Sequence, residues 1–307
     1  MKNIILVNYG GPEKDYQVKD FLFRLFSDRN VVMLPGSRGL QRKLAWIISR
    51  LRARKSQKNY RLIGGSPLNE ITRSLVSELN REGKDRYQMG MTYSPPFITE
   101  VLEGASESEV YFFPLFPHFS LTTTGACLAQ VPGNVGNAFY IKEYWQDPEF
   151  NKLIVKRIKK ELNKTGQDEK TAVLLSAHSI PLAYVERGDP YLDSVKKHFE
   201  ILKEELSGYY LFLGFQSKLG PVKWAEPEVR EVLEEIKRSN FTNVIIYPLS
   251  FVIDNYETVF ELDYELKKDV ETGNGLSFSR IPCLNTDQDF VKFIIKKADE
   301  GPWLKLE

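Results

Sequence analysis

The stretch that decides the fold is Ala172-Val173-Leu174-Leu175-Ser176-Ala177-His178-Ser179-Ile180-Pro181. Its leading apolar residues form a run typical of a buried strand, and polar residues follow directly. Open α/β sheets bind ligands at the carboxyl ends of their strands, which is where His178 falls. Histidine also has an unperturbed pKa close to neutral pH. His178 is therefore a candidate acid–base residue, although a histidine bonded to backbone in the core would give the same pattern.

Strands and helices alternate on both sides of this stretch. Apolar runs predict strands over residues 4–7, 87–92, 110–113, 171–175, 209–214 and 243–248, with helical spacing over 18–26, 98–104, 150–162, 190–206, 227–237 and 290–298. The order recurs, so we predict an α/β protein with two similar Rossmann-like lobes, each a parallel four-stranded sheet flanked by helices. We expect the active-site cleft between the lobes. The expected lobes are residues 1–148 and 149–287, with the C-terminal helix within 288–307 packing back on the first lobe.

Composition excludes several classes of protein. The net charge of +1 over 307 residues gives no global field for nucleic acid. Cys127 and Cys283 are far apart and form no CxxC motif, so we expect no disulfide framework and no iron–sulfur cluster. No apolar stretch approaches the length of a membrane span, and the apolar start is too short for a signal peptide. A cytoplasmic protein is the expectation.

A basic region lies between Asp28 and Glu70, where the sequence has no acidic residue. Arginines and lysines alternate there with apolar residues such as Leu40 and Trp46, most densely over residues 34–55. This pattern is typical of a basic amphipathic helix, which suits an anionic membrane surface or an acidic ligand. A solvated helix face explains the same residues equally well.

An acidic row follows the predicted strand over 243–248. Glu257, Glu261 and Glu265 recur every fourth residue, so they fall near one face of a helix. Such a row is either solvated or a ladder of hard oxygen ligands for a divalent cation, and a π-bulge would keep the row in register.

Taken together, these motifs resemble ferrochelatase, which inserts Fe²⁺ into a porphyrin to make heme. The resemblance runs along nearly the whole chain. It is carried by Asn8-Tyr9-Gly10-Gly11-Pro12, residues 20–29, Gly64-Gly65-Ser66-Pro67-Leu68, residues 120–125, residues 176–181, Arg187-Gly188-Asp189-Pro190-Tyr191, residues 216–221 and residues 257–263.

The resemblance implies the function and the site. His178 and Glu257 would be catalytic, and His178, Glu257, Glu261 and Glu265 would handle the metal. The implied porphyrin-binding residues are Tyr9, Arg52, Ser120, Thr123, Gln216, Lys218 and Trp224. Fe²⁺ and protoporphyrin IX are the implied substrates, no further cofactor is expected, and the basic stretch 34–55 corresponds to the lip of the porphyrin cleft, which touches the membrane in some members. A monomer is expected.

The chain departs from the family pattern at two places. The family usually has histidine where this chain has Asn255, and an amide is no base and a weak metal ligand. Many members also have a basic residue or histidine beside the tyrosine, in the segment that reads Thr92-Tyr93-Ser94 here. The alternatives are a chelatase for coproporphyrin or another tetrapyrrole, a heme or porphyrin carrier without catalysis, and a two-lobed binder of another small molecule.

Overall fold

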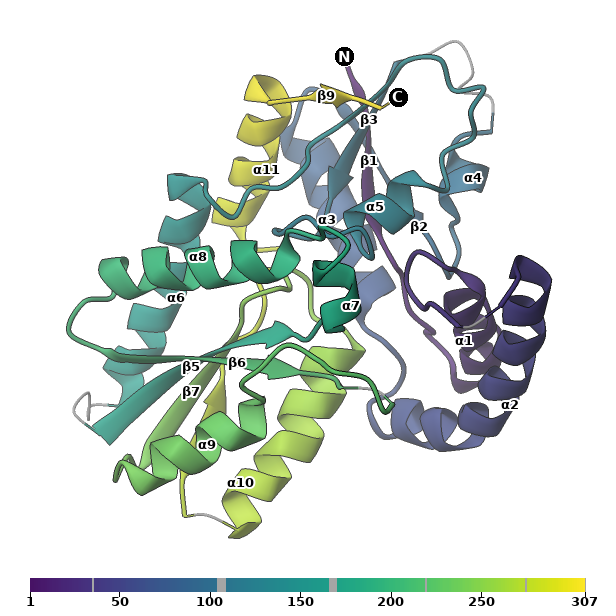
Figure 1. Ribbon diagram of the computed structural model, residues 1–307. Coiled ribbons are helices and arrows are strands. Elements are labelled where there is room, and N and C mark those ends of the chain that lie inside the picture. Colours follow the sequence, from purple (N-terminus) through teal and green to yellow (C-terminus); the bar gives the residue numbers. More distant parts are fainter. Residues whose placement is uncertain (35, 104–108, 166–169, 219, 274, 307) are drawn as a thin grey trace. The chain divides into compact units, whose positions relative to one another are not determined.

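The computed structural model describes residues 1–34, 36–103, 109–165, 170–218, 220–273 and 275–306. Pro35, Gly104 and Leu219, which fall within stretches used above, lie outside the described residues. The chain forms two compact units, Met1–Lys142 together with Ile294–Glu307, and Glu143–Phe293. Each unit is an α/β body around its own sheet (Figure 1).

The sheet of the first unit has the order β2-β1-β3-β4-β9. Its strands are β1 (Asn3–Asn8), β2 (Arg86–Met91), β3 (Val110–Pro114), β4 (Ala138–Tyr140) and β9 (Leu304–Lys305). The first four are parallel, and β9 joins β4 in the antiparallel direction. The predicted parallel sheet is confirmed, but it carries an extra edge strand of two residues, too short to leave a pattern in the sequence.

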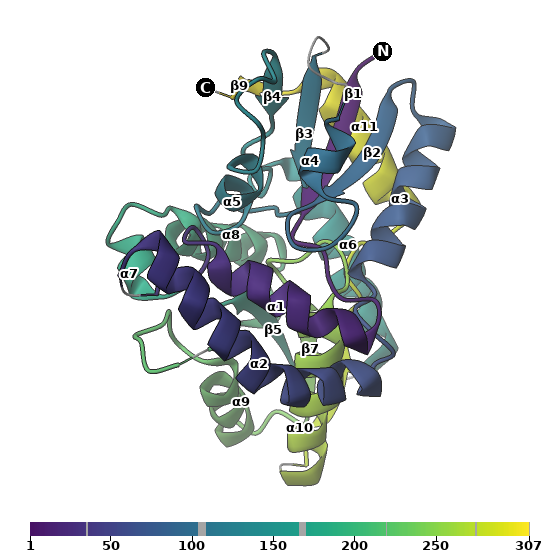
Figure 2. The same cartoon turned by 90° about the vertical axis from the view of Figure 1, so that its right-hand side faces the viewer.

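Helices cover both faces of this sheet. Ile5 and Phe112 belong to one buried cluster with Ile98 and Cys127, so α4 (Ile98–Val101) and α5 (Thr124–Leu128) lie on that face. The helices α3 (Leu68–Glu82) and α11 (Gln288–Glu300) lie on the other side (Figure 2). Lys2, the residue before β1, donates from Nζ to the carbonyl of Ala298 near the end of α11 at 2.5 Å.

The basic stretch forms part of a helical hairpin. After the short η1 (Asp15–Gln17), α1 (Val18–Ser27) packs beside α2 (Arg38–Leu62), as Figure 2 shows. Gln41 is buried between them, and its Nε2 atom donates to the carbonyls of Phe26 (3.0 Å) and Val32 (2.5 Å). Within the described ranges, no helix combines the length and the apolar composition needed to cross a membrane.

The sheet of the second unit has the order β6-β5-β7-β8, with every pairing parallel. Its strands are β5 (Thr171–His178), β6 (Tyr210–Gln216), β7 (Asn243–Pro248) and β8 (Ser277–Arg280). Because β5 has a neighbour on each side and helices on both faces, its residues 171–177 are all buried. This position explains why its sequence is an unbroken apolar run.

The faces of the second sheet are also covered by helices (Figure 1). On one face, Leu174 and Ile246 pack with residues of α9 (Val229–Arg238), of the π-helix η3 (Glu257–Leu266) and of α10 (Lys267–Gly273). On the other lie α6 (Pro148–Thr165) and α8 (Tyr191–Glu205), and the short α7 (Leu182–Val185) follows β5. The fold therefore delivers the ends of β5, β6 and β7 to one edge of the sheet.

Candidate active site

Three strands of the second unit end at one edge of its sheet, and two of them end in a polar side chain. His178 ends β5 and is paired in register with Gln216, which ends β6. Ser176 of β5 is paired with Pro248, the last residue of β7, and the chain then continues toward η3. Since parallel strands end at a common edge, His178 and Gln216 lie at the edge where α/β proteins bind ligands.

The backbone fixes the ring of His178 in one orientation. Its Nδ1 atom lies 2.7 Å from the carbonyl oxygen of Ser179, which can only accept, so Nδ1 donates and carries the proton. The hydroxyl of Tyr191 donates to the His178 carbonyl at 2.9 Å, and the His178 amide donates to Ser250 Oγ at 2.9 Å. No protein group among the described residues bonds to Nε2. In the neutral ring, Nε2 therefore keeps a lone pair for a proton or a metal ion.

Glu257 begins the π-helix, whose i→i+5 hydrogen bonds give a wider turn than an α-helix. A spacing of four residues is therefore close to one turn, which keeps Glu257 and Glu261 on one face. Glu257 is half-buried. Loss of solvation by burial raises the pKa of its carboxyl above the usual range. Glu257 is thus a better proton acceptor than a solvated carboxylate.

Glu261 is held by the end of β6. Gln216 Nε2 donates to Glu261 Oε2 at 3.2 Å, and Ser217 Oγ donates to the same oxygen. Burial, followed by repulsion from Glu257, raises the pKa of Glu261 to about 7. The hydrogen bonds and the nearby His178 act in the opposite direction and only moderate the rise.

The third glutamate of the row lies in a different environment. Glu265 is exposed at the edge of a cavity of about 210 Å³ that also borders Gln216, Ser217 and Glu261. Lys218 lies on the same cavity and forms an ion pair with Glu228 at 3.3 Å. Across the residues that the structure describes, no group of three or more His, Cys, Asp or Glu side chains is arranged to hold a metal ion. The three glutamates therefore lie one after another along the helix, from the exposed Glu265 to the half-buried Glu261 and Glu257. Among the described residues they do not converge on one point where they could bind a metal ion together.

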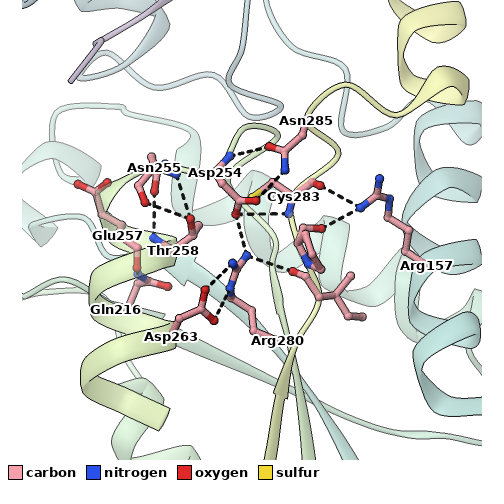
Figure 3. Close-up of polar contacts among 12 residues, drawn as sticks. Arg157, Gln216, Asp254, Asn255, Glu257, Thr258, Asp263, Arg280, Cys283 and Asn285 are labelled. Atoms are coloured by element: carbon pink, nitrogen blue, oxygen red, sulfur yellow. Dashed lines mark hydrogen bonds and ion pairs between the residues drawn. The ribbon is translucent and has the colours of Figure 1, made fainter. Parts of the chain in front are cut away.

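Asn255 caps the helix that carries Glu257. Its Oδ1 atom accepts from the amide of Thr258 at 3.0 Å, and its own amide donates to Thr258 Oγ1 at 2.9 Å (Figure 3). Tyr256 already has helical dihedral angles, so Asn255 occupies the N-cap position of a capping box. Its amide side chain stabilises the helix start, a role that needs no titratable group.

A buried arginine joins the two ends of the glutamate-bearing segment. Arg280, the last residue of β8, donates from Nη1 to Asp254 at 2.7 Å and in bidentate fashion to Asp263 at 2.7 and 2.6 Å (Figure 3). Burial alone would raise the pKa of Asp254, but Arg280 and hydrogen bonds led by Asn285 hold it below the usual range. Asp254 is therefore a buried carboxylate kept ionised by its partners.

The first unit contains four of the predicted residues, Tyr9, Arg52, Ser120 and Thr123. The Tyr9 hydroxyl donates to the carbonyl of Thr122, whose hydroxyl lies 2.8 Å from that of Ser120. Tyr9, Ser120 and Thr123 thus gather where β1 and β3 end. Arg52 lies on α2, exposed, with its guanidinium 5.9 Å from the ring centroid of Phe26.

Two predicted residues bury a polar atom that the protein does not satisfy. The indole Nε1 of Trp224 and the hydroxyl of Thr123 are inaccessible and have no hydrogen-bond partner among the described residues. Trp224 is held by a backbone bridge to Pro181, three residues after His178. Buried groups of this kind are usually satisfied, so each of the two atoms lacks a partner that ordered water or a bound molecule would supply.

The whole chain has recognisable relatives. A sequence model of the ferrochelatase family matches residues 1–301. A ferrochelatase from a Nitratiruptor species is 37% identical over 312 residues, which cover 96% of this chain and 98% of that protein. Among solved structures, CbiX, the terminal enzyme for siroheme biosynthesis in denitrifying bacteria, matches with a TM-score of 0.53 at 12% identity, covering 97% of this chain and 98% of CbiX. The sirohydrochlorin chelatase SirB from Bacillus subtilis subspecies spizizenii, solved with cobalt, has a TM-score of 0.51 at 14% identity, covering 76% of this chain and 90% of SirB.

The structural matches show the fold, which is that of the chelatases. The sequence matches go further, and the chain belongs to the ferrochelatase family. It is therefore an enzyme, a metal chelatase of the lyase class that acts with iron in heme biosynthesis. The resemblance read from the motifs is confirmed.

Some residues of the site are absent from the sequence-based prediction. Ser217, which bonds Glu261, adopts a left-handed backbone with φ of 69°. Arg280 was missed because β8 was not predicted, and Tyr191 because its hydroxyl reaches His178 only through the fold. The strand-end stretch from Gln216 was the available signal for Ser217.

Proposed function

We propose that the enzyme inserts Fe²⁺ into protoporphyrin IX, the last step of heme biosynthesis, with His178 and Glu257 as the residues that remove the pyrrole protons and pass on the metal. The observation that carries this proposal is the state of the two groups. His178 has an oriented ring whose Nε2 has no bonding partner among the described residues, and burial raises the pKa of Glu257. Each group can therefore accept a proton, His178 at Nε2 and Glu257 at its carboxylate.

The proton balance of the reaction fits such a pair. The free porphyrin carries two N–H groups, and Fe²⁺ takes the place of both protons, so two protons must leave for each metal inserted. Nε2 of His178 accepts one proton and Glu257 the other. The imidazolium keeps its Nδ1–H bond to the Ser179 carbonyl, so the ring need not move during transfer.

The glutamate row supplies a route for the substrate iron. Glu265 is exposed, whereas Glu261 and Glu257 are half-buried, so successive carboxylates lead inward along one helix face. Carboxylate and imidazole are ligands that Fe²⁺ accepts. We propose that the ion moves along Glu265, Glu261 and Glu257 to His178, losing water at each step, and that protons leave by the same carboxylates.

The porphyrin contacts combine apolar, polar and cationic side chains. We propose Tyr9, Ser120, Thr123 and Arg52 from the first unit and Gln216, Lys218 and Trp224 from the second. The unsatisfied atoms of Thr123 and Trp224 support ligand contact, as does Arg52, which has no ion pair within the described residues. Arg52 suits a propionate, because arginine binds carboxylates in bidentate fashion.

The state of Lys218 favours protoporphyrin over coproporphyrin. Coproporphyrin has four carboxylates where protoporphyrin has two, so it requires more unpaired cations. Lys218 is already paired with Glu228, which leaves less uncompensated positive charge near the end of β6. This pairing supports the substrate with fewer charges.

The remaining expectations are also proposals. We propose that the enzyme works as a monomer in the cytoplasm, without nucleic acid and without a resident cofactor. Two buried cysteines, Cys127 and Cys283, are too few to ligate an iron–sulfur cluster alone. The exposed apolar residues of α2, among them Trp46 and Leu51, support peripheral contact of residues 34–55 with a membrane.

A substrate comparison tests the proposed reaction. Anaerobic Fe²⁺ insertion is followed by the visible spectrum with protoporphyrin IX and with coproporphyrin III, for the parent and for Glu257→Gln. We expect faster turnover of protoporphyrin and a loss of at least about 100-fold in the variant, with porphyrin binding retained. Faster turnover of coproporphyrin would contradict the substrate, and full activity of Glu257→Gln would contradict the role of Glu257.

A further inference from the structure

The two proposed carboxylates lie on a kind of helix that rarely forms by itself. The structure has ten π-helical residues, Glu257–Leu266, whereas π-helices normally occur as single turns inside α-helices. If this segment relaxed to α-helical hydrogen bonding, the four-residue spacing would still keep Glu257 and Glu261 near one face, but Glu261 would be rotated relative to Glu257 and to its partners Gln216 and Ser217. Something outside the helix must therefore select the π conformation.

Arg280 has the geometry to make this selection. Its guanidinium bonds Asp254, three residues before Glu257, and Asp263, two residues after Glu261. One planar, rigid group thus fixes the chain on both sides of the two glutamates. Figure 3 shows the carboxylate of Glu257 pointing away from this ion pair, so Arg280 bonds the side chains of Asp254 and Asp263 and does not engage the Glu257 carboxylate.

The anchor is itself immobilised. Asp254 also accepts from Asn285 Nδ2 at 2.7 Å, and its amide donates to Asn285 Oδ1 at 2.9 Å. Arg157 of α6 holds the segment after β8 by donating to the Cys283 carbonyl at 2.9 Å. Contacts therefore run from α6 through the β8 segment to the start of the π-helix (Figure 3).

Burial makes a role in stability alone a poor explanation. The side chains of Arg280 and Asp254 are only 8% and 9% exposed. Buried ion pairs are expensive to desolvate, and apolar residues of similar volume often stabilise a protein as well or better. Fixing a specific geometry is a benefit that apolar packing would not provide.

We propose that Arg280 is a positioning residue for iron insertion, which acts by bracing Asp254 and Asp263 so that the π-helix holds Glu261 against Gln216 and Ser217 and in a fixed orientation relative to Glu257. The proposal rests on the function proposed above for these two glutamates. Arg280 contacts neither the porphyrin nor the metal. Replacement of Arg280 lowers the rate at which Fe²⁺ is inserted and leaves the affinity for porphyrin unchanged.

The test compares Arg280→Met, Arg280→Lys and Asp263→Asn with Lys156→Met. The last variant breaks the ion pair between Lys156 and Asp289 (2.5 Å), which is exposed and lies in the same unit. For each protein, kcat and the KM values for Fe²⁺ and for porphyrin are measured well below its unfolding temperature. Amide hydrogen exchange over residues 257–266 is measured without substrates.

We expect Arg280→Met and Asp263→Asn to lower kcat at least tenfold, to change the porphyrin KM less than twofold and to speed exchange over residues 257–266. Arg280→Lys should recover part of kcat, since one ammonium can satisfy one carboxylate but cannot span both. Lys156→Met should match the parent. Unchanged kcat and exchange in folded Arg280→Met would overturn the proposal.

Two provisions keep the outcome decisive. If Arg280→Met does not fold, Asp263→Asn decides, because Asp263 is 36% exposed and its loss leaves Arg280 paired with Asp254. If Glu257→Gln and Glu261→Gln keep full activity, the proposed function of the glutamates fails. In that case amide hydrogen exchange over residues 257–266 still tests whether Arg280 holds the π-helix, because this measurement needs no substrate.

Discussion

Gln216, at the end of β6, donates from Nε2 to Oε2 of Glu261 on the π-helix, 3.2 Å away. The same side chain accepts a 2.6 Å hydrogen bond from Ser176 of β5 at its Oε1 atom. The central strand therefore orients Gln216, and Gln216 orients Glu261. This connection fixes a carboxyl group of raised pKa next to the proposed base.

Replacement of Glu261 by glutamine should stabilise the protein in a pH-dependent way. The pKa of Glu261 is about 7 in the folded protein against an ordinary 4.5, so between these values the folded form keeps a proton that the unfolded form has lost. Folding stability therefore falls as pH rises from about 4.5 to about 7, and above pH 7 the protein keeps the whole of this loss of unfolding free energy. Glu261→Gln should be more stable than the parent by on the order of 2 kcal/mol at about pH 8, and by far less near pH 4.5.

Urea unfolding of both proteins at the two pH values measures this difference. Glu265→Gln is the matched control, because it makes the same change at an exposed position of the same helix. An equal difference between Glu261→Gln and the parent at both pH values would contradict the burial argument.

Asn255 should matter for the helix start and not for proton transfer. Asn255→Ala removes the acceptor for the Thr258 amide, so we expect a loss of about 1 kcal/mol of unfolding free energy. Asn255→Asp and Asn255→Ser keep an oxygen at the cap and should retain most of the stability and activity. Urea titration and Fe²⁺ insertion rates check both points. An Asn255→Ser protein that is stable but inactive would show that the amide has a chemical role.

His198 should make the protein sensitive to acid. It is buried, its Nε2 lies 2.8 Å from Asn151 Oδ1, and burial lowers its pKa to about 3. Below its ordinary pKa of 6.5 the unfolded chain takes up a proton that the folded chain excludes, so stability falls as pH drops toward 3. Between neutral and acid pH, His198→Gln should lose on the order of 3 kcal/mol less unfolding free energy than the parent. Thermal unfolding scans between about pH 7 and pH 4 test it, and parallel pH curves for both proteins would refute it.

The exposed face of α2 should bind anionic lipid. Trp46 and Leu51 are 50% and 77% exposed beside arginines, so Trp46→Ser with Leu51→Ser should lower flotation with anionic vesicles at low salt. Leu304→Ser, at another exposed apolar residue (42%), is the control and should float like the parent. Equal flotation of parent and double variant, or none with the parent, would exclude membrane contact through α2.

The sequence predicted the elements whose side chains are patterned by burial. The apolar run of β5 and the four-residue spacing from Glu257 are visible because buried positions and helix faces impose periodicity. The short strands β4, β8 and β9 were missed, since a strand of two to four residues has no room for a pattern. In α2 the pattern predicts a helix but not its exposed face, because periodicity alone does not reveal that Trp46 faces solvent.

Roles that depend on contacts distant in sequence were the hardest to predict. The cap formed by Asn255 could have been anticipated from Thr258 three residues later, a capping-box spacing. The pairing of Arg280 with Asp254 and Asp263 joins residues 17 and 26 positions apart through the end of an unpredicted strand. Only the folded chain shows that these charges meet.

The most direct test of the proposed mechanism is anaerobic Fe²⁺ insertion into protoporphyrin IX by the parent, by His178→Ala and by His198→Gln. His178→Ala removes Nε2 at the strand end, whereas His198→Gln changes a histidine outside the site. We predict turnover by the parent and by His198→Gln, and a loss of at least about 100-fold in His178→Ala with porphyrin binding retained. Insertion by His178→Ala at the parent rate would contradict the assignment of His178 as the proton acceptor.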